Sequence, residues 1–342
     1  MLVLDSIRYM GIKTKLLDKI IPEVISVTPT NGIVCDIMSG SNVVSYALKE
    51  HFTVYTNDIQ KYSQVISDAV IKNQTASISS QEAEASLSNY VEENLQKRIY
   101  TFFEDTYSQT YFSKQQCQHI DSIRYAIDKV SDADKKSLFL FALMCAMCKV
   151  QSTPGHFAQF MPSTHKRIIP LQQMNLWEEF KTKCDNYKNV YLSNKQNKSF
   201  CMDFKDLIDS GEIDNVDTIY LDSPYSQEQY SRFYHILETL VKYDYPEVAY
   251  KAKYRTDRFM SGLCTKKKAA SEFEYIFNFC KKHSINIVIS YSTNALVPTD
   301  ELISLCKKYF SEIKYQEIDH KHSTQGKGNN SIKEIIISGI HS

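Results

Sequence analysis

The segment whose residues are best suited to carry out a reaction is 218–225, which reads Thr-Ile-Tyr-Leu-Asp-Ser-Pro-Tyr. An apolar strand ends in Asp222, a turn fixed by Pro224 follows, and Tyr225 comes next. At the carboxyl end of a strand, Asp222 can accept a hydrogen bond from an amino group, and a carbonyl of the Ser223 or Pro224 turn can accept a second. Tyr225 can stack on a flat ring. This set suits methylation of an exocyclic amino group, which needs orientation more than deprotonation. A turn without chemical meaning is the alternative, and the flanking strand argues against it.

A second segment, residues 34–42, is a strand that runs into a turn of small residues and then a helix. Small residues let a ligand approach the backbone, and Asp58, at the end of the next strand, suits ribose hydroxyls. The GxGxxG pattern is absent, which argues against a nicotinamide or flavin cofactor. By itself this turn is compatible with a nucleoside site and does not establish one.

A third segment, residues 8–16, reads Arg-Tyr-Met-Gly-Ile-Lys-Thr-Lys-Leu. A glycine flanked by cations before a helix can hold an anionic group such as a carboxylate or phosphate. An ordinary basic helix start is the alternative interpretation.

The elements that must position these segments alternate between strands and helices, which is typical of an α/β protein with a mainly parallel sheet. A helix is expected over residues 43–49, between the first two strands. The strands are predicted over residues 32–37, 52–57, 190–193 or 200–204, 217–221 and 286–291, with an antiparallel pair over 312–318 and 334–339.

The long interval before the Asp222 strand breaks this alternation, and we interpret it as an inserted, mostly helical domain. Its helices are predicted over residues 81–98, 115–130, 133–150 and 171–188. The domain prediction is therefore a catalytic domain of residues 1–73 and 189–342, with residues 74–188 as the helical insertion.

The composition is that of a globular protein, with 342 residues, 40 basic and 40 acidic side chains and no net charge. A nucleic-acid enzyme needs only a local basic face, so this balance does not exclude one. Some of the 23 Tyr and 17 Phe could be flat surfaces for base stacking, although most are expected in the core. The cations that could form a basic face, each otherwise a solvated charge, are Lys13, Lys15, those of residues 251–258, Lys266, Lys267, Lys268 and those of residues 321–327.

Nine cysteines without disulfide-framework spacing, and a start that lacks a signal-peptide pattern, favour reduced thiols and a cytoplasmic location. No apolar run approaches the roughly 18 residues that span a bilayer. Cys145 and Cys148 form a lone CxxC in an apolar run and predict a buried helix face. We expect no metal site, because His320 and His322 lack carboxylate or thiolate partners at ligand spacing.

Taken together and in this order, these segments resemble the Dam-like, alpha-group N6-adenine DNA methyltransferases over most of the chain. That family has an RxxGxKxxL-type motif, a DxFxGxG-type turn, a recognition insertion, an Asp-Phe strand end and a DPPY motif. Met38 and Asn42 stand where the family has Phe and its final Gly, and Ser223 replaces a Pro. An initial Asp favours adenine over cytosine N4 methylation.

The resemblance implies roles for individual residues. Asp222, Pro224 and Tyr225 would hold the target base. The cofactor-binding residues would be Tyr9, Gly11, Lys13, Asp36, Ser39, Gly40, Asp58, Asp203 and Phe204. Among these, Gly11 and Lys13 would face the cofactor's methionine end, and Asp58 would bind the ribose.

The resemblance also implies a Rossmann-like, S-adenosylmethionine-dependent methyltransferase sheet with a helical target-recognition insertion. The reaction would be methyl transfer from S-adenosyl-L-methionine to the N6 amino group of an adenine flipped out of double-stranded DNA. A cognate restriction endonuclease would be a candidate partner, and no membrane association is expected. A methyltransferase acting on RNA and a non-catalytic nucleic-acid-binding protein of the same fold remain alternatives.

Three further segments are candidates for contacts with DNA. Residues 229–242 predict a helix whose Tyr230, Arg232, Phe233 and His235 could contact the extruded strand, although Phe233 fits a core position equally well. Residues 323–330 are similar to the family's glycine-containing substrate loop, with a plain hairpin as the alternative. Residues 151–167 either connect two helices or offer the base-reading groups of Gln151, His156, Gln159, His165 and Arg167.

Overall fold

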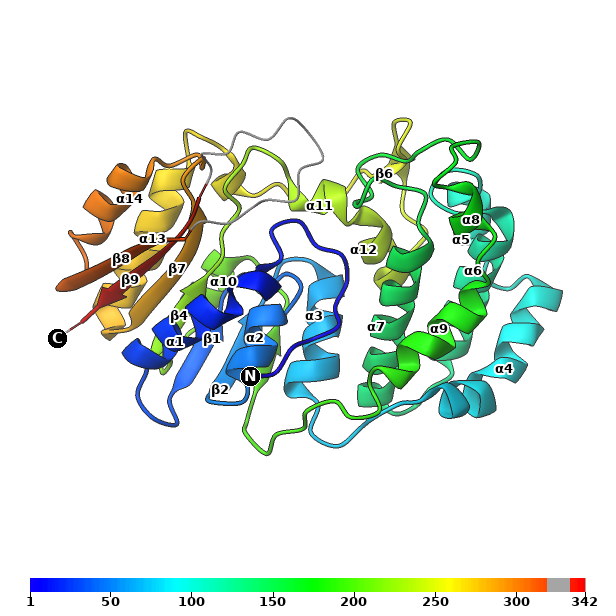
Figure 1. Cartoon of the computed structure of the whole chain (residues 1–342), viewed down its shortest axis with the longest axis horizontal. Coiled ribbons are helices and arrows are strands. Elements are labelled where there is room, and N and C mark those ends of the chain that lie inside the picture. Colours follow the sequence, from blue (N-terminus) through cyan, green and yellow to red (C-terminus); the bar gives the residue numbers. More distant parts are fainter. Residues whose placement is uncertain (319–332, 342) are drawn as a thin grey trace.

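The computed structural model describes residues 1–318 and 333–341, and its main element is a seven-stranded sheet of order β3-β2-β1-β4-β7-β9-β8 (Figure 1). Neighbours from β3 to β7 are parallel, and β9 pairs antiparallel with β7 and β8. This is a Rossmann-like methyltransferase sheet with the predicted antiparallel pair. The strands are β1 (Ile33–Asp36), β2 (Thr53–Asn57), β3 (Lys198–Phe200), β4 (Thr218–Leu221), β7 (Asn286–Ser292), β8 (Glu312–Ile318) and β9 (Glu334–Ile340). The predicted substrate loop, residues 323–330, lies outside the described residues.

The third strand differs from its prediction. Residues 190–193 form no strand, and of residues 200–204 only Phe200 belongs to β3. The backbone of Tyr191 bonds to side chains instead of a strand, since its N–H donates to the Tyr46 hydroxyl and its carbonyl accepts from Lys49 Nζ, both at 2.9 Å. Hydrogen bonds from the backbone to distant side chains cannot be predicted from the local pattern of apolar residues.

Successive residues of the strands face two different hydrophobic cores. Val34 and Val288 pack in one core, whereas their neighbours Cys35 and Ile289 pack in the other. Strands buried on both faces read as continuous apolar runs, which explains why most were recognisable in the sequence. The first core contains α1 (Leu17–Val27), α2 (Val43–Leu48) and α3 (Lys61–Ser67), and the second contains α10 (Phe204–Asp209), α13 (Ala269–His283) and α14 (Thr299–Cys306).

A helical layer lies beside the sheet (Figure 1). Its predicted helices are confirmed except over 171–188, where Asn175 accepts hydrogen bonds from the N–H groups of Trp177 and Glu178 and starts a new helix. Cys145 and Cys148 are buried in α7, as predicted, and all nine cysteines are free thiols. The helices are α4 (Ser80–Lys97), α5 (Phe102–Tyr107), α6 (Lys114–Asp128), α7 (Ala133–Val150), α8 (Ile169–Gln172) and α9 (Leu176–Asp185).

The chain that follows the Asp222 motif also packs against this layer. The predicted helix over 229–242 divides at Tyr234, because the Phe233 carbonyl accepts a hydrogen bond from Phe157 N–H (2.9 Å) and leaves the helical pattern. Arg124 Nε donates to the carbonyl of Leu240 (2.9 Å). The division into catalytic and recognition domains stays a prediction. The elements here are α11 (Tyr230–Phe233), α12 (His235–Lys242), β5 (Val248–Ala249) and β6 (Tyr254–Arg255), besides the short helical turns η1 (Lys13–Leu16), η2 (Asp68–Lys72) and η3 (Gly262–Cys264).

Within residues 1–318 and 333–341, none of the helices combines the length and apolar character needed to cross a bilayer. The same residues contain no group of three His, Cys, Asp or Glu side chains placed to hold a metal ion. His320 and His322 lie outside them.

Candidate active site

The carboxyl ends of β1, β2 and β4 border one pocket with an empty volume of about 1010 Å³, its open mouth included. Open α/β sheets commonly bind their ligands at this edge, outside the carboxyl ends of the strands. Tyr225 packs next to the lining rather than in it. The site residues expected from the sequence that line the pocket are Tyr9, Gly11, Lys13, Asp36, Ser39, Gly40, Asp58, Asp203, Phe204, Asp222 and Pro224.

The turn after β1 is held by Asp58, which follows β2. Gly40 N–H donates to Asp58 Oδ2 (3.0 Å), and Gln60 N–H donates to Asp58 Oδ1 (2.8 Å). Gly40 has a φ of +48°, and a Cβ there would lie 2.8 Å from the Tyr9 hydroxyl. The turn therefore requires glycine at this position, both for its backbone conformation and for the close approach of Tyr9.

Asn42 explains how the turn departs from the family pattern without losing its shape. Its φ is +59°, a left-handed conformation that asparagine tolerates better than other side chains. It is fully buried, and its Nδ2 donates to the carbonyls of Ser63 (3.0 Å) and Gly40 (3.3 Å). The side chain thus fixes the turn from inside.

Asp36, the last residue of β1, is a buried acid with one oxygen still available. Ser45 Oγ donates to Asp36 Oδ2 (2.5 Å), whereas Oδ1 has no hydrogen-bond partner among the described residues. Burial, assisted by the charges of Asp222 and Asp58, raises the pKa of Asp36 to about 7. An unpartnered carboxylate oxygen in a pocket wall is suited to a positively charged or hydrogen-bond-donating ligand.

We expect Asp36→Asn to stabilise the ligand-free chain near pH 8 by up to about 4 kcal/mol, the free-energy equivalent of a pKa raised from 3.8 to about 7. The folded-state pKa of about 7 lies above the ordinary 3.8, so the folded chain holds a proton that the unfolded chain has lost between these values. Stability linked to Asp36 therefore falls as pH rises through that window. Denaturant unfolding of both chains at about pH 5 and pH 8 measures the difference. If the two chains differed in free energy of unfolding by the same amount at both pH values, the expectation would be contradicted.

Asn57 connects the ends of β1 and β3, a role that the sequence did not reveal. Its Nδ2 donates to the carbonyls of Ile37 (3.2 Å) and Met202 (3.1 Å), and its Oδ1 accepts from Met202 N–H (3.2 Å). Asp203 then caps α10 by accepting from Lys205 N–H (2.9 Å). Asn57 therefore holds the Asp203 wall of the pocket against the β1 turn.

Lys13 contacts Asp222 directly. Its side chain is 3% exposed, and Nζ lies 2.9 Å from Asp222 Oδ1 and 3.0 Å from the Gly11 carbonyl. Burial acts to lower the pKa of Lys13, but the charges of Asp222 and Glu334 outweigh it and raise the pKa. Burial also raises the pKa of Asp222, and Lys13 opposes that rise. Lys13 therefore holds one carboxylate oxygen of Asp222 and favours the ionised form of the group.

Glu334 is a third charged group at this site, and sequence reasoning missed it. It is 2% exposed and lies opposite Ser292 where β9 begins beside the end of β7. Burial raises its pKa, while the charge of Lys13 acts to lower it. The signal in the sequence was an acid at the start of a predicted strand, but only the antiparallel register places it near Asp222.

Tyrosines hold the segment of residues 9–12 across the pocket. The Tyr9 ring stacks on Tyr234 with centroids 4.6 Å apart, and Met10 N–H donates to the Tyr234 hydroxyl (2.6 Å). Gly11 has a φ of +74°, and a Cβ there would lie 3.1 Å from the Tyr225 hydroxyl. The spacing of Tyr230 and Tyr234 was visible in the sequence, but their partner segment was not.

Two expectations about DNA contacts are wrong. His235 is fully buried and its Nε2 lies 3.0 Å from the Phe157 carbonyl, so it cannot reach a strand; Phe233 is in the core. Gln151 is buried, with its amide bonded to the Cys148 carbonyl (2.9 Å) and the Thr153 hydroxyl (2.7 Å). Both polar side chains make their hydrogen bonds inside the protein, whereas Gln159 and Arg167 are exposed.

Residues 9–297 match the family model of the D12 class N6 adenine-specific DNA methyltransferases. The chain belongs to this family. The match begins at Tyr9 and includes the β1 turn, the helical layer and the Asp222 motif, so it covers every element that borders the pocket.

Curated relatives agree with this assignment. The chain is 28% identical to modification methylase LlaI of Lactococcus lactis subsp. lactis over 96% of its length, and 25% identical to modification methylase StsI of Streptococcus sanguinis over 94%. These matches cover 54% and 50% of the relatives, so the chain spans about half their length. It is also 24% identical to type II methyltransferase M.NlaIII of Neisseria lactamica, with 88% of each chain covered.

Proposed function

We propose that this family member transfers a methyl group from S-adenosyl-L-methionine to the N6 amino group of an adenine flipped out of double-stranded DNA. The observation that carries the proposal is Asp222, which ends β4 with Oδ1 held by Lys13 in a pocket that also contains Asp36 and Asp58. An endonuclease that cuts the same site when it is unmethylated is the partner that this activity predicts.

The residues of the Asp222 motif orient the adenine. Asp222 Oδ2, which no described group hydrogen-bonds, accepts one N6–H, and a carbonyl of the Ser223–Pro224 turn accepts the other. Tyr225 stacks on the base, and its own carbonyl is fixed by Leu296 N–H (3.0 Å). These contacts direct the N6 lone pair away from the ring plane and toward the cofactor side of the pocket.

The opposite wall fits the cofactor. S-adenosyl-L-methionine supplies an electrophilic methyl group on a positively charged sulfur. Asp58 would accept from the ribose hydroxyls, and Asp203 and Phe204 would border the cofactor's adenine. The free Oδ1 of Asp36 offers negative charge to the cationic end of the molecule.

The bonds, electrons and proton of the proposed methyl transfer can all be accounted for. The N6 lone pair forms the new N–C bond as the C–S bond breaks, and the electron pair of that bond stays on sulfur. N6 becomes positively charged and releases one proton, which Asp222 accepts along its existing hydrogen bond. Burial, which raises the pKa of Asp222, favours this acceptance.

Transfer of radiolabelled methyl groups tests the proposal. Unmodified chromosomal DNA, total RNA and a protein mixture are each incubated with the chain and labelled S-adenosyl-L-methionine. We expect label in DNA alone, recovered as N6-methyladenine after digestion to nucleosides. Label confined to RNA or protein, or its absence from all three, contradicts the proposal.

Asp58→Ala and Asp203→Ala should each weaken S-adenosyl-L-methionine binding by roughly 1–3 kcal/mol, because each removes a partly buried hydrogen-bond acceptor from the cofactor wall. The expected loss is larger for Asp58, which also holds the β1 turn through Gly40 N–H. Calorimetric titration with the cofactor measures both, and Asp209→Ala, on the far end of α10, is the control. Unchanged affinity in both variants would mean that the cofactor wall lies elsewhere.

Tyr225→Ala should lower turnover by roughly ten- to a hundredfold, because a stacking contact is worth about 1–3 kcal/mol per base. Tyr225→Phe should retain most activity, since stacking needs the ring and not the hydroxyl. Initial rates on saturating DNA separate the two. If the phenylalanine variant were as slow as the alanine variant, the hydroxyl and not the ring would be the functional group.

A further inference from the structure

A short hairpin contacts the helical layer and directly precedes, along the chain, a segment that lines the pocket. We name residues 244–257 the Tyr250 hairpin: β5 and β6 pair antiparallel, with Val248 opposite Arg255, and residues 250–253 form the turn. Tyr250 is 81% exposed, the most exposed of the large hydrophobic side chains of the described residues. The chain then runs directly into Phe259 and Ser261, which line the pocket.

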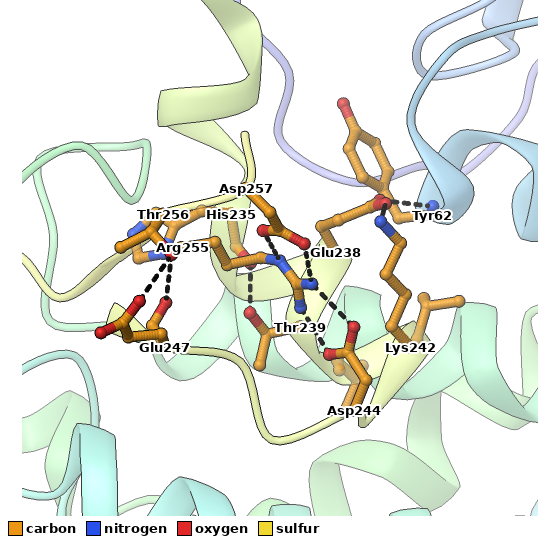
Figure 2. A network of polar contacts seen from close by, with 12 residues as sticks. Tyr62, His235, Glu238, Thr239, Lys242, Asp244, Glu247, Arg255, Thr256 and Asp257 are labelled. Atoms are coloured by element: carbon orange, nitrogen blue, oxygen red, sulfur yellow. Dashed lines mark hydrogen bonds and ion pairs between the residues drawn. The ribbon is translucent and has the colours of Figure 1, made fainter. Parts of the chain in front are cut away.

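The base of this hairpin is held by a buried cation. The Arg255 guanidinium is 2% exposed and binds both Asp244 oxygens (2.7 Å each) and both Asp257 oxygens (2.9 and 2.8 Å). Figure 2 shows this side chain between the two carboxylates, with the Glu238–Lys242 pair of α12 nearby. Bidentate pairs fix geometry as well as charge, so the two ends of the hairpin have one relative position.

The turn is fixed too, although its tip packs in no core. Tyr111 Oη donates to the Ala252 carbonyl (2.8 Å), and Lys253 Nζ donates to the Thr106 carbonyl. Four of the nine non-glycine residues with positive φ in the described chain fall between positions 243 and 253, Tyr250 among them. Such backbone is costly and persists at positions where surrounding contacts impose it, commonly at functional sites. Here those contacts present an exposed aromatic ring on a rigid support.

The acids and bases of the hairpin are separated along it. Asp244 and Asp257 both bind Arg255 at its base, and Glu247 is the third acid, whereas Lys251 and Lys253 lie in the turn, so residues 244–257 carry no net charge but their turn is basic. Lys251, Lys253 and Arg258 form no ion pair with any carboxylate of residues 1–318 and 333–341. Lys251 is exposed directly beside Tyr250. An exposed ring flanked by unpaired cations suits a stacked base between phosphates better than an apolar protein surface.

We infer that the Tyr250 hairpin is a DNA-contacting element in which the Tyr250 ring stacks on a base of the duplex beside the flipped adenine and Lys251 contacts a phosphate. This inference rests on the proposed function and adds to it the side chain that engages the duplex outside the pocket. A protein surface as the occupant is the competing outcome.

The first test measures binding to a short fluorescein-labelled duplex of mixed sequence and methylation of unmodified chromosomal DNA. Tyr250→Ala should weaken duplex binding about 5- to 150-fold, the span that corresponds to one lost stacking contact. Tyr250→Phe should bind like the unchanged chain, and S-adenosyl-L-methionine affinity should stay unaltered in both. Tyr90→Ala, which removes another exposed tyrosine from α4, is the matched control.

The second test reads stacking itself. Trp177 is the single tryptophan, so Tyr250→Trp in a Trp177→Phe chain reports from the hairpin alone. Its fluorescence should be quenched by the duplex and not by free phosphate at equal ionic strength. Duplex affinity of Tyr250→Ala equal to that of Tyr90→Ala, or no quenching on binding, overturns the inference, as does altered self-association without altered DNA binding. Binding and quenching need no turnover, so absence of methyl transfer by the unchanged chain would count against the proposed function alone.

Discussion

Asp222→Ala should lower the rate of DNA methylation by roughly 10³-fold or more while leaving S-adenosyl-L-methionine affinity nearly unchanged. The reason is that the proposed function assigns Asp222 to the target amine and not to the cofactor: its Oδ1 is held by Lys13, and its Oδ2 would accept from the base. Single-turnover rates with labelled cofactor measure the first effect, and calorimetric titration measures the second.

The matched control is Asp217→Ala, one residue before the same strand. Asp217 Oδ2 accepts from Ile33 N–H (2.7 Å) at the opposite end of the sheet, so its loss should affect stability and leave the chemical step intact. Near-normal methylation by Asp222→Ala would refute the assignment of the catalytic carboxylate. Equal loss of cofactor binding and rate would assign Asp222 to the cofactor instead.

Lys13→Met should make methylation dependent on alkaline conditions. Lys13 opposes the burial that raises the pKa of Asp222, so removal of its charge raises that pKa further. A protonated Asp222 cannot accept from the target amine, and the acidic limb of the rate profile should therefore move upward. We expect a loss of methylation at pH 7 that is partly recovered near pH 9.

Lys15→Met provides the comparison, because Lys15 is exposed on the same short helix. Its profile should coincide with that of the unchanged chain. A loss in Lys13→Met that is the same at every pH would mean that Lys13 acts on the cofactor, as the family resemblance implies, and not through the ionisation of Asp222.

The sequence predicted those parts of the site that depend on local order along the chain. Asp222 and Asp58 each directly follow a buried strand, and parallel strands bring their carboxyl ends to one edge, so their meeting in one pocket follows from the topology. Glu334 could not be found this way, because its place depends on the antiparallel register of β9 against β7. The errors at His235 and Gln151 have another cause: a polar side chain that makes its hydrogen bonds inside the protein looks, in sequence, like one free for DNA.

The contact between Met10 and Tyr234 also affects the order in which the chain can fold during its synthesis. The two residues are 224 positions apart, and β1 must likewise wait for β4 before its second edge is paired. Helices α4 and α6, by contrast, find each other within a short stretch of chain. A nascent chain released in order from a ribosome thus folds its helical layer first and leaves the amino-terminal segment undocked until Tyr234 has emerged. The pocket, whose lining extends from Tyr9 to Cys264, is therefore complete only after most of the polypeptide exists.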